Sequence, residues 1–174
     1  MTGTTCKHRL PAICLLLYLL AAVSSCSHGD TRTEFTPLGR NTDGHVRFSL
    51  DMTDTACIYT LSLIVRFHKS YSSPQLDMGI TLTSPSGSQG HETVSFPSDY
   101  STVKNYLNGH PEDTRISLAS SPDYYDIRWV YRTGIVPPEA GIWEMDMDLP
   151  EDRQAILGAG VSLGRQTTDN NQTH

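Results

Sequence analysis

Residues 57–67 read Cys-Ile-Tyr-Thr-Leu-Ser-Leu-Ile-Val-Arg-Phe, and this stretch decides the fold. Successive side chains of an extended chain point to opposite faces, so apolar residues at every second position predict a strand with one buried face. The alternation holds for eleven residues, which indicates a long strand. Cys57 heads the inward row, and we interpret it as a small core hydrophobe with no reactive role. The inward row consists of Cys57, Tyr59, Leu61, Leu63, Val65 and Phe67.

Shorter stretches of the same kind lie on both sides of this strand, and turn residues separate most of them. Residues 97–124 are polar and interrupted by proline, so we predict a long loop there, with one weak strand near Ile116 and Leu118. No long helix is expected. Seven or eight short strands predict an all-β domain, either an antiparallel β-sandwich or a jelly roll. The other expected strands span residues 45–50, 76–83, 92–96, 126–131, 142–149 and 156–163.

The first 25 residues are typical of a secretory signal. Lys7 and Arg9 precede an apolar run over residues 12–23, and small residues then lead to Cys26. The run has twelve residues, whereas a membrane-spanning helix needs roughly 20. The order resembles the lipobox of bacterial lipoproteins, which implies cleavage before Cys26, a diacylglycerol on its sulfur and an acylated amino terminus. Two or more acyl chains anchor a protein lastingly. A plain signal peptide with Cys26 free is the alternative.

The sequence thus divides into a signal peptide (1–25), a flexible tether (26–44), a β-sandwich domain (45–165) and a disordered tail (166–174). Removing residues 1–25 leaves 11 basic and 19 acidic residues, a net charge of −8. That surplus argues against nucleic acid or an anionic lipid surface as the partner. Cys57 is then the one thiol besides Cys26, so the domain has no intrachain disulfide and its stability must come from packing.

Three carboxylates alternate with apolar residues near the end of the domain. On a strand, Glu144, Asp146 and Asp148 share one face, so they are candidates for a divalent cation site. The alternative is the solvated face of an amphipathic strand, because side chains two apart stand roughly 7 Å from each other. The histidines are scattered without HxH or HxxxH spacing, so we expect them on the surface and expect no bound metal or cofactor.

Aromatic residues offer a second candidate site. Tyr124, Tyr125 and Trp129 could form a platform for a sugar, or they could serve in core and strand packing. A hydrolase is the third class considered. Ser88 is a serine in a turn, but it lacks the G-x-S-x-G frame and no base can be assigned to it, so we predict that the protein is not an enzyme.

Several motifs follow one another in the order found in a known family. They are Tyr-Thr-Leu-Ser-Leu-Ile-Val-Arg at 59–66, and the segments 74–78, 84–87, 92–96, 141–145 and 157–163. On these motifs the chain resembles the gliding-motility lipoproteins of the GldH type, found in the Bacteroidetes. The resemblance covers roughly residues 45–165. It implies a non-enzymatic, membrane-anchored accessory protein tied to gliding and protein secretion.

A shorter similarity concerns residues 82–87, which read Leu-Thr-Ser-Pro-Ser-Gly and follow Asp77. Together with Gly-Ile-Trp at 141–143, they look like the core of the P domain of subtilisin-like convertases, which is also a jelly roll. That similarity ranks second, because it is shorter and no protease accompanies it here.

The sequence therefore predicts a lipoprotein attached through Cys26 to the outer membrane, on the periplasmic side. Its role would be accessory or assembly work with other envelope proteins, without chemistry of its own. A β-sandwich module that binds carbohydrate or protein is the alternative, so a glycan partner stays open.

Overall fold

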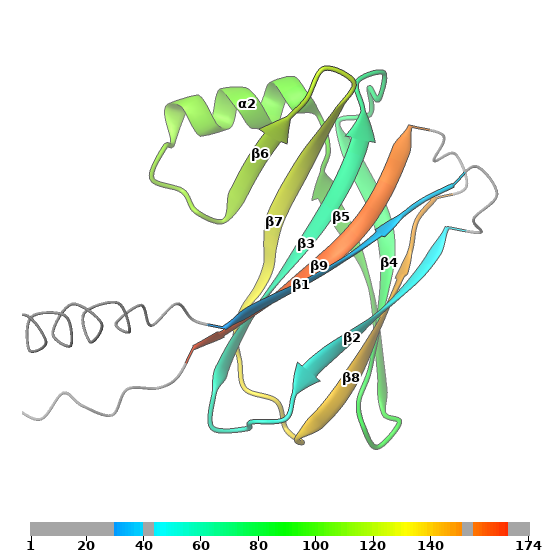
Figure 1. Ribbon diagram of the computed structural model, residues 1–174, viewed down its shortest axis with the longest axis vertical. Helices are drawn as coiled ribbons and strands as arrows, with labels where there is room; N and C mark the ends of the chain where they lie inside the picture. The colour runs from blue at the N-terminus through cyan, green and yellow to red at the C-terminus, as the bar shows by residue number, and fades with distance from the viewer. Residues whose placement is uncertain (1–29, 40–43, 151–154, 167–174) are drawn as a thin grey trace, which may run out of the picture.

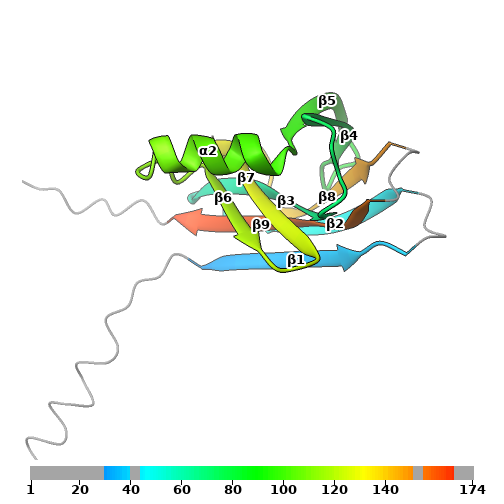
Figure 2. The same cartoon turned by 90° about the horizontal axis from the view of Figure 1, so that it is seen from above.

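The computed structural model describes residues 30–39, 44–150 and 155–166, and within them nine strands form two antiparallel sheets. One short helix, α2, lies beside the larger sheet (Figures 1 and 2). The predicted all-β sandwich is confirmed, with nine strands in place of seven or eight. The elements are β1 (Thr31–Pro37), β2 (His45–Met52), β3 (Ile58–His68), β4 (Gln75–Thr83), β5 (Gln89–Pro97), α2 (Tyr100–Gly109), β6 (Ile116–Ser120), β7 (Tyr124–Ile135), β8 (Gly141–Asp148) and β9 (Ile156–Gln166).

The strand order is β1-β9-β3-β7-β6 in the five-stranded sheet and β2-β8-β4-β5 in the four-stranded sheet. The central strand β3 is the long strand expected from residues 57–67, and it pairs with β7 on one side and β9 on the other. Both sheets turn their apolar rows toward each other, as the period of two requires. The inner row of β3 is buried along its whole length, and Cys57 at its head is 2 % exposed. The interpretation of Cys57 as a core residue is confirmed.

Strand β1 corrects the prediction of a flexible tether over residues 26–44. Residues Thr31–Pro37 pair with β9 in antiparallel register, from Thr31 opposite Gly164 to Pro37 opposite Gly158. Glycines 158 and 160 have no side chains, so the ring of Phe35 lies directly on β9. The five-stranded sheet thus includes residues 31–37 of the predicted tether, and β9 includes Gln166, which belonged to the predicted tail.

Helix α2 corrects the prediction of a loop over residues 97–124. Asp99 caps its first turn, because the aspartate side chain accepts a hydrogen bond from the amide of Thr102 at 2.7 Å. Val103 is its buried residue. The weak strand expected near Ile116 and Leu118 is present as β6, the edge of the five-stranded sheet.

The sandwich has two ends, and in Figure 1 the loops of one end lie at the bottom, with the start of β1 above them on the left, whereas α2 lies at the top. The tether end carries the first residue of β1 together with the loop 53–57, the turn 84–88 and the connection 136–140. The opposite end carries α2 and the turn between β6 and β7. Cys26 and the predicted signal peptide lie outside the described residues, as does the predicted tail from 167 onward. Within the described ranges, no helix has the length and apolar character needed to cross a membrane.

Candidate functional site

The three carboxylates of β8 face the neighbouring strand β2, where basic side chains stand opposite them. Arg47 donates from Nε to Asp146 Oδ1 at 2.6 Å and lies 3.6 Å from a Glu144 oxygen. His45 contacts Asp148 through Nδ1 at 2.8 Å and Asp146 through Nε2 at 3.1 Å. The carboxylate oxygens are thus engaged in cross-strand contacts with basic side chains. The three residues share one face of an amphipathic strand, as the alternative to a cation site expected, although Asp146 on that face is buried.

These ion pairs alter the titration of the basic partners. The hydrogen bond to Asp148 raises the pKa of His45 above its ordinary value, and the nearby charge of Asp146 adds to the effect. The hydrogen bond from Arg47 to Asp146 likewise raises the pKa of the guanidinium. Among the described residues, no group of three or more His, Cys, Asp or Glu side chains is placed to hold a metal ion. The row is therefore an ion-pair ladder on the outer face of the four-stranded sheet.

The three aromatic candidates do not form one platform, because neighbours on a strand point to opposite faces. Tyr124 lies on the outer face of β7, with the guanidinium of Arg66 4.4 Å from its ring centre. Tyr125 points inward and is 0 % exposed, so it presents no face to a sugar, and core packing, the alternative given for these residues, describes it. Its hydroxyl donates to the carbonyl of Ser98 at 2.9 Å, and burial raises the pKa of Tyr125 to about 12.

Trp129 has a different environment, because it lines a groove. One edge of its ring system meets Phe96 in the core, with 5.9 Å between ring centres. The opposite side borders a hollow of about 460 Å³ between α2, β6 and β7, which we call the α2 groove. A hollow of this size falls within the range of small-molecule sites. The α2 groove is lined by Pro97, Thr102, Val103, Tyr106, Asp113, Arg115, Ile116, Trp129 and Val130.

A polar network closes one side of the α2 groove. Tyr106 donates its hydroxyl to Asp113 Oδ2 at 2.6 Å, and Arg115 forms a two-pronged contact with the same carboxylate at 2.8 and 3.0 Å. Arg115, and secondarily Tyr106, hold the pKa of Asp113 well below its usual range. The groove therefore combines two aromatic rings, Tyr106 and Trp129, with a fixed carboxylate and an exposed guanidinium. Such a combination suits an uncharged polar ligand or a protein side chain.

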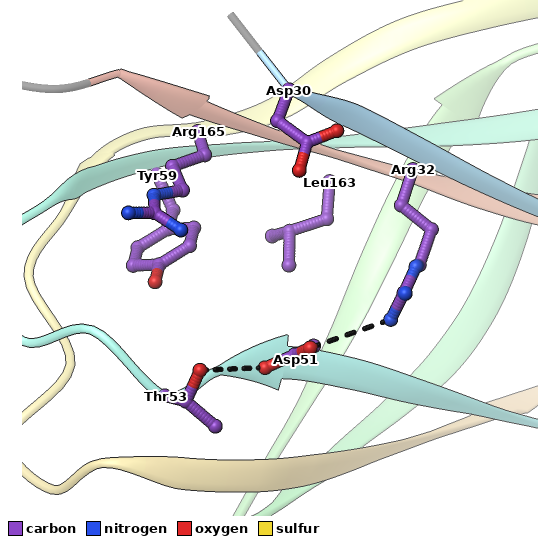
Figure 3. Close-up of a pocket in the computed structure, with 7 residues that line it drawn as sticks. All are labelled: Asp30, Arg32, Asp51, Thr53, Tyr59, Leu163 and Arg165. Atoms are coloured by element: carbon purple, nitrogen blue, oxygen red, sulfur yellow. Dashed lines mark hydrogen bonds and ion pairs between the residues drawn. The ribbon is translucent and has the colours of Figure 1, made fainter.

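A second, smaller pocket lies at the tether end between β1, β2 and β9, and Figure 3 shows its lining. Its volume is about 80 Å³, room for little more than a few water-sized groups. Arg32 lies 3.4 Å from Asp51, and Asp51 in turn accepts a hydrogen bond from Thr53 at 2.9 Å. Arg165 enters from β9. The other lining residues are Asp30, Tyr59 and Leu163.

Arg165 also gives Cys57 an electropositive neighbour that the sequence did not reveal. Its Nε donates to the sulfur at 3.2 Å, while its Nη2 contacts Asp54 at 2.9 Å. The thiol donates to the same Asp54 carboxylate at 3.1 Å, which lowers the pKa of Asp54. All three groups are therefore engaged with one another. These contacts hold the start of β3 in place. Because the thiol is buried, it is not an exposed nucleophile.

No protein-family model matches the chain, and a search of curated proteins finds no match either. The resemblance to the gliding-motility family thus has no independent support. Function must be argued from the residues themselves.

The α2 groove is the feature that sequence reasoning missed. Its walls come from residues 97–130, of which most were assigned to a loop. One local signal was available: Asp99 stands three residues before Thr102, as a helix cap does, and a polar helix follows. Without that helix, Trp129 had no visible partner surface.

Proposed function

We propose that the chain is an envelope lipoprotein whose β-sandwich acts as a non-enzymatic accessory or assembly component. The observation that carries the proposal is the position of Cys26. It ends a signal-like leader, and only residues 27–30 separate it from the first residue of β1. A lipid on Cys26 would therefore be joined almost directly to a strand of the five-stranded sheet.

The rest of the domain is consistent with a role in holding a partner. With −8 net charge after removal of the leader, electrostatic attraction would not bring the protein to an anionic surface, so lipid must supply the attachment. The exposed acids and bases described above are tied into pairs, while the α2 groove offers an apolar surface with few polar groups. We assign the protein to the outer membrane, on the periplasmic side. Membership of the gliding-motility lipoprotein family is part of this proposal.

Fractionation of the native host tests the anchor. Cys26→Ala should move the protein from the membrane to the soluble fraction, because no acyl chain can be attached, while its β-sheet circular dichroism stays unchanged. The matched control is Cys57→Ala, which alters the other cysteine of the mature chain and should leave the membrane fraction intact. A membrane fraction that Cys26→Ala does not change would refute the anchor, as would a native mass without acyl groups.

The assembly role is tested by crosslinking in living cells. A photoreactive amino acid at Thr102, on the rim of the α2 groove, should capture envelope proteins that mass spectrometry can identify. The same residue at Gln89, on the far edge strand β5, is the control for chance encounters. Equal labelling from both positions would contradict a specific partner at the groove.

Glycan binding is the second candidate function, and the two aromatic rings of the α2 groove favour it. The chain has two tryptophans, so Trp143→Phe leaves Trp129 as the sole tryptophan, whose emission can be excited selectively over that of the tyrosines. If a sugar stacks on that ring, soluble envelope glycans should shift or quench its emission in a saturable way. Unchanged emission across such a panel would exclude this alternative.

A further inference from the structure

Beyond the proposed anchor, the chain joins the five-stranded sheet at Asp30, opposite the last residues of β9. The carbonyl of Asp30 accepts a hydrogen bond from the amide of Arg165 at 2.9 Å. Arg165 stands opposite Tyr59 on β3, and Tyr59 stands opposite Ile135 on β7. These four residues form one row across four neighbouring strands. The connection that begins at Val136 therefore leaves the sheet at the same end of the strands at which the chain enters it.

The reach of the chain sets how far this row can stand from the lipid. Cys26 and Asp30 are four residues apart, which is about 14 Å at full extension. The row from Asp30 to Ile135 spans three strand spacings, also about 14 Å. By contrast, the eleven residues of β3 extend for about 36 Å. A link of 14 Å cannot span the length of the sandwich, so the tether end must lie nearest the membrane.

The tether end also carries apolar side chains that are at least half exposed. Val136 is 59 % exposed and Ile142 is 50 % exposed. They are two of the three large apolar residues that are exposed within the described ranges, and the third is Tyr106 on α2. Ile142 stands opposite Asp51, which pairs with Arg32 on β1, so it lies close to the chain entry as well. Pro138, between the two, is also exposed.

The arginines of the tether end are each paired with a carboxylate. Arg165 contacts Asp54, and Arg32 contacts Asp51. Arg132, near the end of β7, contacts Glu92 and adjoins Tyr131, which also bonds that carboxylate. With Asp30 and Glu139 included, three guanidinium groups stand against five carboxylates, so the tether end has no surplus of positive charge that could attract anionic headgroups. Contact with a lipid surface there would depend on apolar side chains and only weakly on salt.

We infer that the tether end rests against the lipid surface, with Val136 and Ile142 at the level of the headgroups and the α2 groove turned away from the membrane. This orientation rests on the proposed anchor at Cys26. Apolar side chains at such a boundary are buried in the interface, as in peripheral membrane segments. The α2 groove would then face the aqueous compartment, where an envelope partner could reach it.

Fluorescence quenching on vesicles tests the orientation. The acylated protein is purified from membranes and placed on vesicles of phosphatidylethanolamine and phosphatidylglycerol that contain a doxyl-labelled lipid. One variant carries an environment-sensitive dye at Val136→Cys, and the matched control carries it at Asn105→Cys, an exposed position on α2. Cys57 is buried and does not compete for the dye. The dye at position 136 should lose most of its fluorescence, whereas the dye at 105 should keep it.

A second variant asks whether the two apolar side chains hold the orientation. The substitutions Val136→Ser and Ile142→Ser affect exposed residues, so the domain should still fold and the acylated protein should still float with vesicles. A dye at Pro138→Cys should be quenched in the parent protein and released from quenching in the double variant. Salt at 1 M should leave the parent signal almost unchanged.

The outcomes separate the orientation from the anchor. Vesicle-bound protein with equal quenching at positions 136 and 105 would overturn the orientation while the anchor stands. Quenching at 138 that the double variant does not change would overturn the role of Val136 and Ile142. Protein that carries no acyl chain and does not float would overturn the anchor itself, and the orientation with it.

Discussion

The outer faces of the two sheets both carry an arginine paired with an aspartate, but the surroundings of the two pairs differ. On the five-stranded sheet, Arg66 donates to Asp126 at 2.7 and 2.8 Å, and its guanidinium lies between the rings of Phe35 and Tyr124. On the four-stranded sheet, Arg47 contacts Asp146 from an open surface and shares that carboxylate with His45. Both pairs are hydrogen-bonded, but only the guanidinium of the first pair also has aromatic rings packed against it.

The difference extends over each whole face. The five-stranded face includes two serines, Ser62 and Ser162, that are almost fully buried although they point away from the core. Strand β1 covers the glycines of β9, and Thr33 donates to Ser162 at 3.1 Å. On the four-stranded face, the basic side chains of the ladder, His45 and Arg47, are exposed to solvent around the buried carboxylate of Asp146. We therefore expect the five-stranded face to respond to changes of volume and the four-stranded face to respond to pH and salt.

The largest effect should come from filling the close contact between β1 and β9. A Cβ atom at Gly160 would lie 2.6 Å from the carbonyl of Glu34 and 2.9 Å from the ring of Phe35. Gly160→Val should therefore lower the free energy of unfolding by about 3 kcal/mol, measured by urea denaturation. Gly90→Val is the matched control, because nothing lies within 4 Å of a Cβ there. Equal stability of the two variants would show that β1 is not held by this contact.

Removal of the packed arginine should have the next largest effect. Arg66→Ala leaves Asp126 without its partner and removes the ring contacts, so we expect a loss of about 2 kcal/mol. A double-mutant cycle with Asp126→Asn, measured by denaturation, separates the ion pair from the ring contacts. If the coupling disappears in 1 M salt, the pair is as solvent-screened as a surface pair and the proposed contrast fails.

Ser62 offers a substitution that should keep or raise the stability of the domain, unlike the two above. Among the described residues, its Oγ is the buried side-chain polar atom that has no hydrogen-bond partner. Removing an unsatisfied buried hydroxyl avoids its desolvation cost, so Ser62→Ala should be neutral or raise stability by up to about 1 kcal/mol. Ser162→Ala, which removes a bonded hydroxyl of the same face, is the control and should be destabilising. A clear loss in Ser62→Ala would mean that its hydroxyl is bonded in solution.

The smallest effect should appear on the four-stranded face and should depend on pH. Because the pKa of His45 is raised in the folded protein, its stabilising charge is fully present below the ordinary value near 6.5. That contribution is lost as the pH rises through the folded-state value. His45→Gln should thus cost on the order of 0.5 kcal/mol at pH 6 and nothing at pH 9, by thermal unfolding. A pH-independent cost would argue against the ladder.

The parts of the fold that the sequence predicts are those in which burial is decided within one strand. In β3, residues two apart share the core face, so alternation alone shows the strand and its orientation. Strand β1 has no such pattern. Its one large apolar residue is Phe35, and what it packs on is a pair of glycines in β9, far along the chain. A contact of that kind leaves no local periodicity, which is why the segment looked like a tether.

The candidate site residues also include some that the sequence shows and others that only the fold brings together. The carboxylate row of β8 and its two interpretations were visible, but the choice between them needed β2, whose His45 and Arg47 come to lie opposite only in the folded sheet. The α2 groove was not predicted, because it needs Tyr106 of α2 and Trp129 of β7 to line one hollow, and α2 is a polar helix with a single buried residue. Cys26 is a purely local signal, and its lipidation stays a prediction.

The edge position of β1 has a mechanical consequence for a protein held by its amino terminus. With an anchor at Cys26, a pull on the body is transmitted through residues 27–30 to Thr31, and the first structure to bear the load is the ladder between β1 and β9. The hydrophobic core is strained only after those seven residue pairs yield. The packing of the Phe35 ring on the glycines of β9 would resist the separation of β1 from β9. The force needed to break that contact would then set how much shear the anchored domain withstands.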